Sequence, residues 1–256
     1  MKKIIVSPQQ GERPWLKWFC SWVSRTVLCI FFANIVIPCI AAGPYPEHLS
    51  NKKEIRVAKP ALTSIDIRDL PLEDYPLLSK FTNLKNIYMT SWGNSFVTDE
   101  KLKALADIGF TNLTYIGLNN CQLVTDKGIT ALSKIQSLKE LSLEGTAITD
   151  AACIQMASPM SLTMINVANC DGITKMGLSA LAKSASLQEI SFSADKLTQD
   201  EVLALLDSFR NVTWCEIIDP EKKLDSNVTK AKGAEKKIHV TIRPTGALQD
   251  MKHFRT

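Results

Sequence analysis

The chain has 256 residues, of which 45% are hydrophobic and 22% are charged, with 30 lysines and arginines against 26 acidic residues. The charges are segregated: residues 1–42 carry five bases and one acid, residues 220–256 carry nine and four, and the stretch between carries 16 bases and 21 acids. Aromatic residues are not interleaved with the bases of the carboxy-terminal stretch, which argues against a platform for single-stranded nucleic acid.

The first 42 residues place basic residues before an uncharged apolar run. The run, residues 26–42, is at the lower limit for spanning a bilayer and slightly long for the apolar region of a signal peptide. Basic residues on its amino side predict that the following residues lie outside the cytoplasm. Three interpretations remain: a cleaved export signal, an uncleaved membrane anchor that contacts the bilayer through residues 26–42, or a buried segment that caps the domain.

Residues 62–219 repeat one pattern about seven times, after a linker and amino-terminal cap at residues 43–61. One copy reads Leu113-x-x-Ile116-x-Leu118-x-x-Cys121, and equivalent residues begin copies at positions 62, 84, 138, 162, 187 and 212. A period in the twenties with apolar residues at fixed offsets is typical of a leucine-rich repeat solenoid.

The second half of each copy predicts a short helix. In the copy above, Val124-Thr125-Asp126 precedes apolar residues three apart, and the threonine is placed to cap the helix amino terminus. One strand and one helix cannot bury their apolar residues alone, so stacked copies must share a core.

The unit resembles the cysteine-containing class of leucine-rich repeats, because residues 113–132 match its L-x-x-L-x-L-x-x-C-x-x-(I/V)-T-D-x-G-(L/I)-x-x-L pattern throughout. The resemblance implies an α/β fold: a right-handed solenoid, or horseshoe, with a parallel β-sheet on the concave face and short helices on the convex face. Such proteins are mostly binding scaffolds, and many are ubiquitin-ligase substrate receptors that carry an F-box before the repeats. Residues 70–75 resemble the start of an F-box, but we interpret them as the turn and return arm of the first repeat.

No pattern predicts chemistry. The histidines all lie outside residues 62–219, and there is no C-x-x-C pair or glycine-rich phosphate loop. We therefore expect no enzyme activity, metal, cofactor or small-molecule substrate. Four cysteines occupy inward-pointing positions of the repeats, where we expect small buried residues: Cys121, Cys153, Cys170 and Cys215.

The strand residues between the apolar positions are expected to face the concave side. Aromatic groups there are typical interface anchors, and glutamates fit a basic protein partner. The expected contact residues are Tyr88, Tyr115, Asn119, Glu140, Glu144, Met164, Glu189, Trp214 and Glu216. A solvated sheet with scattered aromatic groups is the alternative. A longer turn carrying Trp92 and Phe96 is interpreted as a second contact site or an amino-terminal cap.

Residues 220–256 are expected to form a basic tail with a loop up to Glu235 and a capping strand over residues 237–243. The whole pattern predicts a non-enzymatic protein-recognition scaffold, exported or membrane-anchored, that binds a protein on its concave face. The alternatives are an intracellular adaptor resembling ubiquitin-ligase receptors or membrane-complex assembly factors, and a bacterial effector that binds a host protein.

Overall fold

The computed structural model describes residues 46–91, 96–158 and 160–244. The described helices and strands belong to one compact unit that begins at Glu47. The apolar run at residues 26–42, predicted as a signal or anchor, lies outside the described residues, as does Trp92. Within the described ranges, no helix combines the length and apolar character needed to cross a membrane.

Nine strands of the described residues form one parallel sheet in chain order. They are β1 (Glu47–His48), β2 (Ser64–Asp66), β3 (Asn86–Tyr88), β4 (Tyr115–Gly117), β5 (Glu140–Ser142), β6 (Met164–Asn166), β7 (Glu189–Ser193), β8 (Trp214–Ile218) and β9 (His239–Arg243). The connecting helices are α2 (Lys52–Val57), the 3-10 helix η1 (Leu72–Lys80), α3 (Asp99–Asp107), α4 (Asp126–Leu132), α5 (Asp150–Ala157), α6 (Lys175–Ala182), α7 (Gln199–Ser208) and α8 (Ser226–Glu235).

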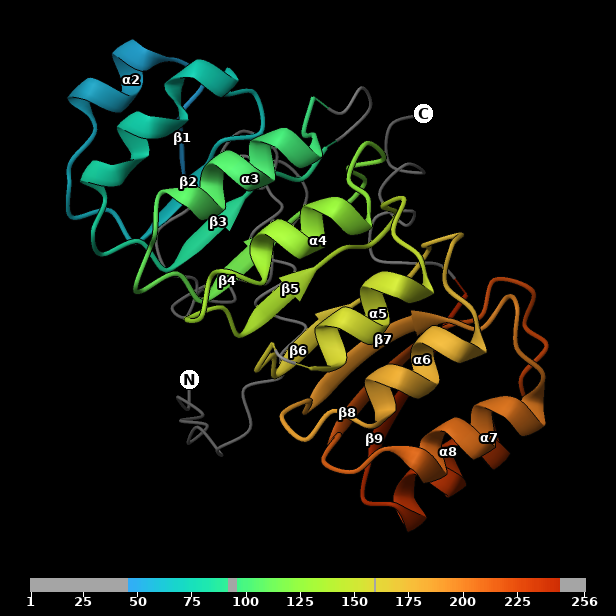
Figure 1. Cartoon of the computed structure of the whole chain (residues 1–256). Coiled ribbons are helices and arrows are strands. Elements are labelled where there is room, and N and C mark those ends of the chain that lie inside the picture. The colour runs from blue at the N-terminus through green and yellow to red at the C-terminus, as the bar shows by residue number, and fades with distance from the viewer. Residues whose placement is uncertain (1–45, 92–95, 159, 245–256) are drawn as a thin grey trace, which may run out of the picture. The chain divides into compact units, whose positions relative to one another are not determined.

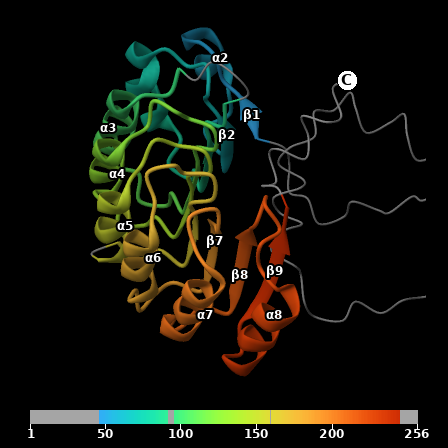
Figure 2. The same cartoon turned by 90° about the vertical axis from the view of Figure 1, so that its right-hand side faces the viewer.

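The helices cover one face of the sheet, as the two views in Figure 1 and Figure 2 show. The sheet face that carries no described helix is called the open face below. This arrangement confirms the predicted α/β solenoid with a parallel sheet and short helices.

The core follows directly from the repeat. The second residue of each strand from β2 to β8 pairs in one register, from Ile65 to Cys215, and each of these residues is at most 1% exposed. Burying an isoleucine or leucine side chain stabilises the fold by roughly 1.5–3 kcal/mol relative to leaving it exposed. Since each copy meets only its neighbours, this stabilisation is shared along the whole stack.

The solenoid extends beyond both expected ends of the repeat region. Strand β1 and helix α2 precede residue 62, and α8 and β9 follow residue 219. The expectation of a loop up to Glu235 is corrected, because Asp225 caps a ten-residue helix there. The buried positions of α8 carry Thr229 and Gly233 in place of leucine, which is why no apolar pattern revealed it. A Cβ at Gly233 would lie 2.3 Å from Val240 Cγ2, so this helix packs unusually close to β9.

Candidate functional site

Two rows of side chains cross the open face. Neighbouring strands in a sheet lie about 4.8 Å apart, so residues paired in register form continuous rows. The first row is Ser64, Asn86, Tyr115, Glu140, Met164, Glu189, Trp214 and His239. The second row is Asp66, Tyr88, Gly117, Ser142, Asn166, Ser191, Glu216 and Thr241.

An aromatic pair occupies the part of the open face near the amino terminus. The rings of Tyr88 and Tyr115 lie with their centroids 5.1 Å apart at an angle of 45°. A Cβ at Gly117 would lie 2.8 Å from Tyr115 Oη, so this glycine leaves room for the Tyr115 ring to lie along the sheet. Burial, and secondarily the charge of Glu140, raises the pKa of Tyr88 to about 12. The Tyr88 phenol is therefore neutral at physiological pH.

A second aromatic pair lies across β8 and β9. The Trp214 ring stacks on His239 with centroids 4.3 Å apart and planes inclined by 25°. Beside them, Arg243 Nε lies 2.8 Å from Glu216 Oε1, and Ser191 Oγ donates to Glu216 Oε2 at 3.2 Å. His239 and Arg243 were not expected at the contact face, because the sequence indicated only that β9 caps the last repeat.

The centre of the open face differs from its two aromatic ends. Asn119, Glu144 and Met164 were expected as contact residues, yet each is at most 8% exposed. The Glu144 carboxylate accepts hydrogen bonds from Asn166 Nδ2 at 3.3 Å and Asn169 Nδ2 at 3.1 Å. Asn119 accepts a hydrogen bond from Ser142. The structure thus places Asn119 and Glu144 in polar contacts between neighbouring repeats, whereas the aromatic ends are partly exposed.

The remaining expected residues lie around these groups. Glu140 and Glu189 are half-buried in the first row, on either side of Met164. Phe96, expected with Trp92 as a second contact or cap, is 63% exposed. Leu123 holds the equivalent turn position of the next repeat and is 53% exposed. The sequence did not single out Leu123, although both residues precede the buried valine of their turns.

A ladder of threonine and aspartate side chains joins the helix amino termini of successive repeats. Asp150 Oδ1 accepts from the backbone N–H of Thr174 at 2.8 Å, and Asp150 Oδ2 accepts from Thr174 Oγ1 at 2.6 Å. Asp99 bonds Thr125 in the same way, as does Asp126 with Thr149. These three bonded pairs are called the threonine–aspartate ladder below. The sequence predicted the helix-capping role of the threonines but not these bonds between repeats.

The ladder explains one glycine of the repeat and ends before the last repeats. Gly177 N donates to Asp150 Oδ1 at 3.0 Å, and a Cβ at Gly177 would lie 2.3 Å from that oxygen. Lys175 replaces the aspartate in the next copy, and Thr198 is instead capped by its own Glu201. The seam between α6 and α7 is joined by an exposed ion pair, with Lys175 Nζ 3.3 Å from Glu201 Oε1.

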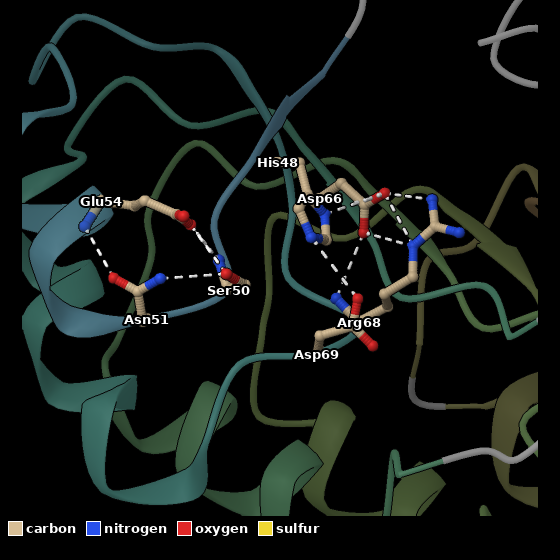
Figure 3. Close-up of polar contacts among 7 residues, drawn as sticks. All are labelled: His48, Ser50, Asn51, Glu54, Asp66, Arg68 and Asp69. Atoms are coloured by element: carbon tan, nitrogen blue, oxygen red, sulfur yellow. Dashed lines mark hydrogen bonds and ion pairs between the residues drawn. The ribbon is translucent and has the colours of Figure 1, made fainter.

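Polar side chains fasten the amino-terminal end of the sheet, as Figure 3 shows. His48 lies between two carboxylates, with Nδ1 3.7 Å from Asp66 Oδ2 and Nε2 3.4 Å from Asp69 Oδ2. Arg68 Nε donates to Asp66 Oδ1 at 3.0 Å. These contacts join β1 to β2 and to the turn that follows β2, so the carboxylates of Asp66 and Asp69 have a structural role. No cluster of three or more potential metal ligands occurs within the described part of the chain.

The four cysteines of the repeats are free thiols buried in the core. Burial raises the pKa of Cys153 and Cys215, and it raises the pKa of Cys170 to about 11. Since the thiolate is the reactive form, these thiols are poor nucleophiles at neutral pH. Thr146 occupies the position equivalent to Cys170 and donates to the same carbonyl oxygen, that of Leu143. All four cysteines are small buried residues, and Cys121 and Cys170 also donate hydrogen bonds to backbone carbonyl oxygens.

A comparison with protein families agrees with this architecture. Residues 111–133, which contain β4 and α4, match the family described as leucine-rich repeat. A comparison with curated proteins finds no match.

Among solved structures, the chain is similar to the leucine-rich repeat-containing protein LegL7 from Legionella pneumophila, with 13% identity, a TM-score of 0.48, and coverage of 66% of this chain and 64% of that one. It is also similar to the Rad7 and Elc1 complex in yeast (15% identity, TM-score 0.45, 71% and 54% covered). A third is the TLR13–ssRNA13 complex (12% identity, TM-score 0.40, 65% and 28% covered). The match spans less than two thirds of each of these chains.

The family match covers one repeat, and the strands on both sides of that repeat continue its register through the sheet. The chain therefore contains a matched leucine-rich repeat within a solenoid of stacked strand–helix units.

Proposed function

We propose that this protein is a non-enzymatic recognition scaffold that binds a protein partner on the open face of its sheet. The observation that carries the proposal is the pair of aromatic groups near opposite ends of that face, Tyr88 with Tyr115 and Trp214 with His239. Aromatic side chains dominate the energetics of protein interfaces. Their positions on paired strands mean that little ordering entropy is lost when a partner binds.

The charge of the face supports a partner with a basic surface. Glu140 and Glu189 stand between the two aromatic groups, whereas Glu216, in the second row beside Trp214, is paired with Arg243. The part of the chain between residues 43 and 219 holds 21 acids and 16 bases, so its field attracts a cationic surface. Complementary charge mainly raises the association rate and excludes anionic partners.

We further propose that the scaffold is exported or membrane-anchored. The support is the basic residues before the apolar run at residues 26–42. The test is the intact mass of the protein from its native cells, measured separately in soluble and membrane fractions. A soluble species that begins near residue 43 supports export, and a full-length species confined to membranes supports an anchor. A full-length soluble species contradicts both.

Site-specific photo-crosslinking in native cells tests the binding face. A photoreactive phenylalanine analogue replaces Tyr115 or Trp214 on the open face. In the control proteins it replaces Ile154 or Met176, which are 53% and 63% exposed on the helical side. We expect both sheet positions to capture the same protein and both helical positions to leave it uncaptured. Capture from the helical positions alone, or from none of the four, contradicts the proposal.

Purified partner then allows affinity measurements. Tyr115→Ala and Trp214→Ala each remove a large aromatic contact, and hot-spot truncations cost at least about 2 kcal/mol, or roughly 30-fold in Kd. Ile154→Ser is the matched control and leaves Kd unchanged. Equal affinities for all four proteins would place the partner elsewhere.

A further inference from the structure

We propose that the outward side of helix α2 is a membrane-contact surface that lies against anionic lipid headgroups. This surface is separate from the open face of the sheet, so the inference does not depend on the protein-binding proposal.

Helix α2 is held firmly although it has only six residues. At its amino end, Asn51 Oδ1 accepts from the backbone N–H groups of Lys53 and Glu54, and Ser50 N donates to the Glu54 carboxylate at 2.6 Å (Figure 3). At its carboxyl end, Lys80 Nζ donates to the carbonyl oxygens of Ile55 and Ala58. Ile55 is fully buried, so the opposite side of the helix is fixed in an outward orientation.

The outward side of α2 is positively charged. Four exposed bases lie within residues 51–61, at Lys52, Lys53, Arg56 and Lys59. The one acid of this segment, Glu54, is engaged with Ser50, whose hydrogen bonds lower the pKa of the Glu54 carboxyl. Without this segment, residues 43–219 hold 12 bases and 20 acids. The basic patch is therefore a local reversal of charge within an acidic domain.

An exposed apolar side chain lies among these bases. Val57 is 78% exposed, the largest exposure among the large hydrophobic residues of the described chain, and it follows Arg56 directly. Apolar side chains beside lysine and arginine are typical of surfaces that rest in the headgroup region of a bilayer. An acidic protein would account for the bases but gives Val57 no particular role.

The position of α2 in the sequence also favours a membrane. The apolar run at residues 26–42 ends nine residues before Asn51, and nine extended residues span at most about 30 Å. If this run enters a bilayer, α2 is the first helix of the repeat domain that can reach the membrane surface. Clusters of lysine and arginine beside a membrane segment bind anionic headgroups.

Hydrogen–deuterium exchange of the full-length chain tests this surface directly. The chain is measured with vesicles of phosphatidylcholine alone and with vesicles that also contain phosphatidylglycerol. We expect the amides of residues 52–59 to gain protection only with the anionic vesicles, while those of α8 do not change. Protection confined to residues 26–42, or equal protection of α2 and α8, overturns the proposal. Unchanged exchange in α2 with both kinds of vesicle also overturns the proposal and favours an acidic protein as the partner of the basic patch.

Charge-neutralised variants separate a specific patch from general attraction. Lys52→Gln, Lys53→Gln and Arg56→Gln are combined, since glutamine retains helix propensity. The control combines Lys222→Asn, Lys230→Gln and Lys237→Asn, which removes three exposed bases near α8. We expect the α2 variant to lose the anionic-lipid-dependent part of vesicle binding by about tenfold or more, whereas the control loses little. Equal losses in both variants, or none in the α2 variant, contradict the proposal.

Discussion

Asp150 shows how one side chain can join two repeats. Its carboxylate accepts two hydrogen bonds from Thr174 and one from the backbone N–H of Gly177. Removing it leaves two backbone N–H groups at the start of α6, those of Thr174 and Gly177, without this acceptor. The pair Thr149-Asp150 therefore acts in two repeats at once: the threonine caps its own helix and the aspartate stabilises the start of the next.

We predict that Asp150→Ala lowers the free energy of unfolding by about 3 kcal/mol, or roughly 1 kcal/mol for each lost hydrogen bond. Urea unfolding followed by circular dichroism measures the change. Asp171→Ala, at an exposed turn position, is the control and should change stability by less than about 0.5 kcal/mol. Equal effects of the two substitutions would show that the ladder contributes no stability.

Cys170 makes the fold sensitive to alkaline pH. Burial raises its thiol pKa from the ordinary 9.0 to about 11, so the folded state retains the proton more strongly than the unfolded state. The resulting stabilisation is complete below pH 9 and is lost as the pH rises toward 11. We predict that the urea midpoint falls over this range and that it falls less in Cys170→Thr.

Threonine is a suitable replacement because Thr146 already occupies the equivalent position of the preceding repeat. Its hydroxyl does not titrate in this range. Urea midpoints at pH 7.5, 9 and 10.5 supply the comparison, with the other thiols common to both proteins. Parallel curves for the two proteins would exclude Cys170 as a source of the alkaline loss.

At the scale of elements, α8 and β9 act as a closing repeat. Five residues of β9 pair with β8 in parallel, and Ile238 and Val240 join the buried core. They cover the side of β8 that a solenoid ending at Asp219 would expose. An uncovered strand edge is a template for pairing with another chain.

We predict that a chain ending at Asp219 melts at a lower temperature and aggregates, while a chain ending at Pro244 matches the full-length chain. Thermal melting and light scattering distinguish these results. The truncation at Pro244 is the control, because it keeps every described element. If the chain ending at Asp219 is monomeric and equally stable, the last helix and strand do not protect the core.

The sequence predicted those helices and strands whose apolar residues follow the regular spacing of the repeat. Leucine and isoleucine at fixed offsets gave the central strands and helices, and alternation along each strand gave the side on which Tyr115 and Trp214 lie. The exposure of individual side chains could not be predicted in this way, because it depends on residues of the neighbouring repeat. Glu144, for example, accepts a hydrogen bond from Asn169, which strand pairing and not sequence spacing brings close. Helix α8 was missed because its core contacts use Thr229 and Gly233, which carry no apolar signal.

At the scale of the whole molecule, the charges are segregated along the chain. The acidic central region lies in sequence between two basic segments, around α2 and α8. Like charges on the two terminal repeats oppose end-to-end stacking of molecules, which is a hazard for any solenoid with an open sheet. We expect this repulsion to disfavour end-to-end association through the described repeats.

Because the threonine–aspartate ladder is interrupted at Lys175, we expect the repeats before and after this residue to unfold as two separate cooperative units. A stacked solenoid unfolds according to the strength of its successive interfaces, so its weakest seam separates units that can open independently. The exposed pair of Lys175 and Glu201 is worth at most about 1 kcal/mol, less than the bonds of a ladder step. We predict that native-state hydrogen exchange finds residues 198–244 opening at a lower free energy than residues 99–182.

Lys175→Asp combined with Glu201→Gln supplies the missing carboxylate and keeps a side chain able to complete the cap of Thr198. In this variant the two opening free energies should converge, whereas Lys175→Ala should leave them apart. If the wild-type chain already opens as one unit, the α6–α7 interface does not separate two cooperative units, which contradicts the prediction. If the chain opens as two units, the carboxy-terminal repeats can unfold separately although the sheet is continuous. The segment that contains Trp214 can then unfold and refold while the segment that contains Tyr115 remains folded.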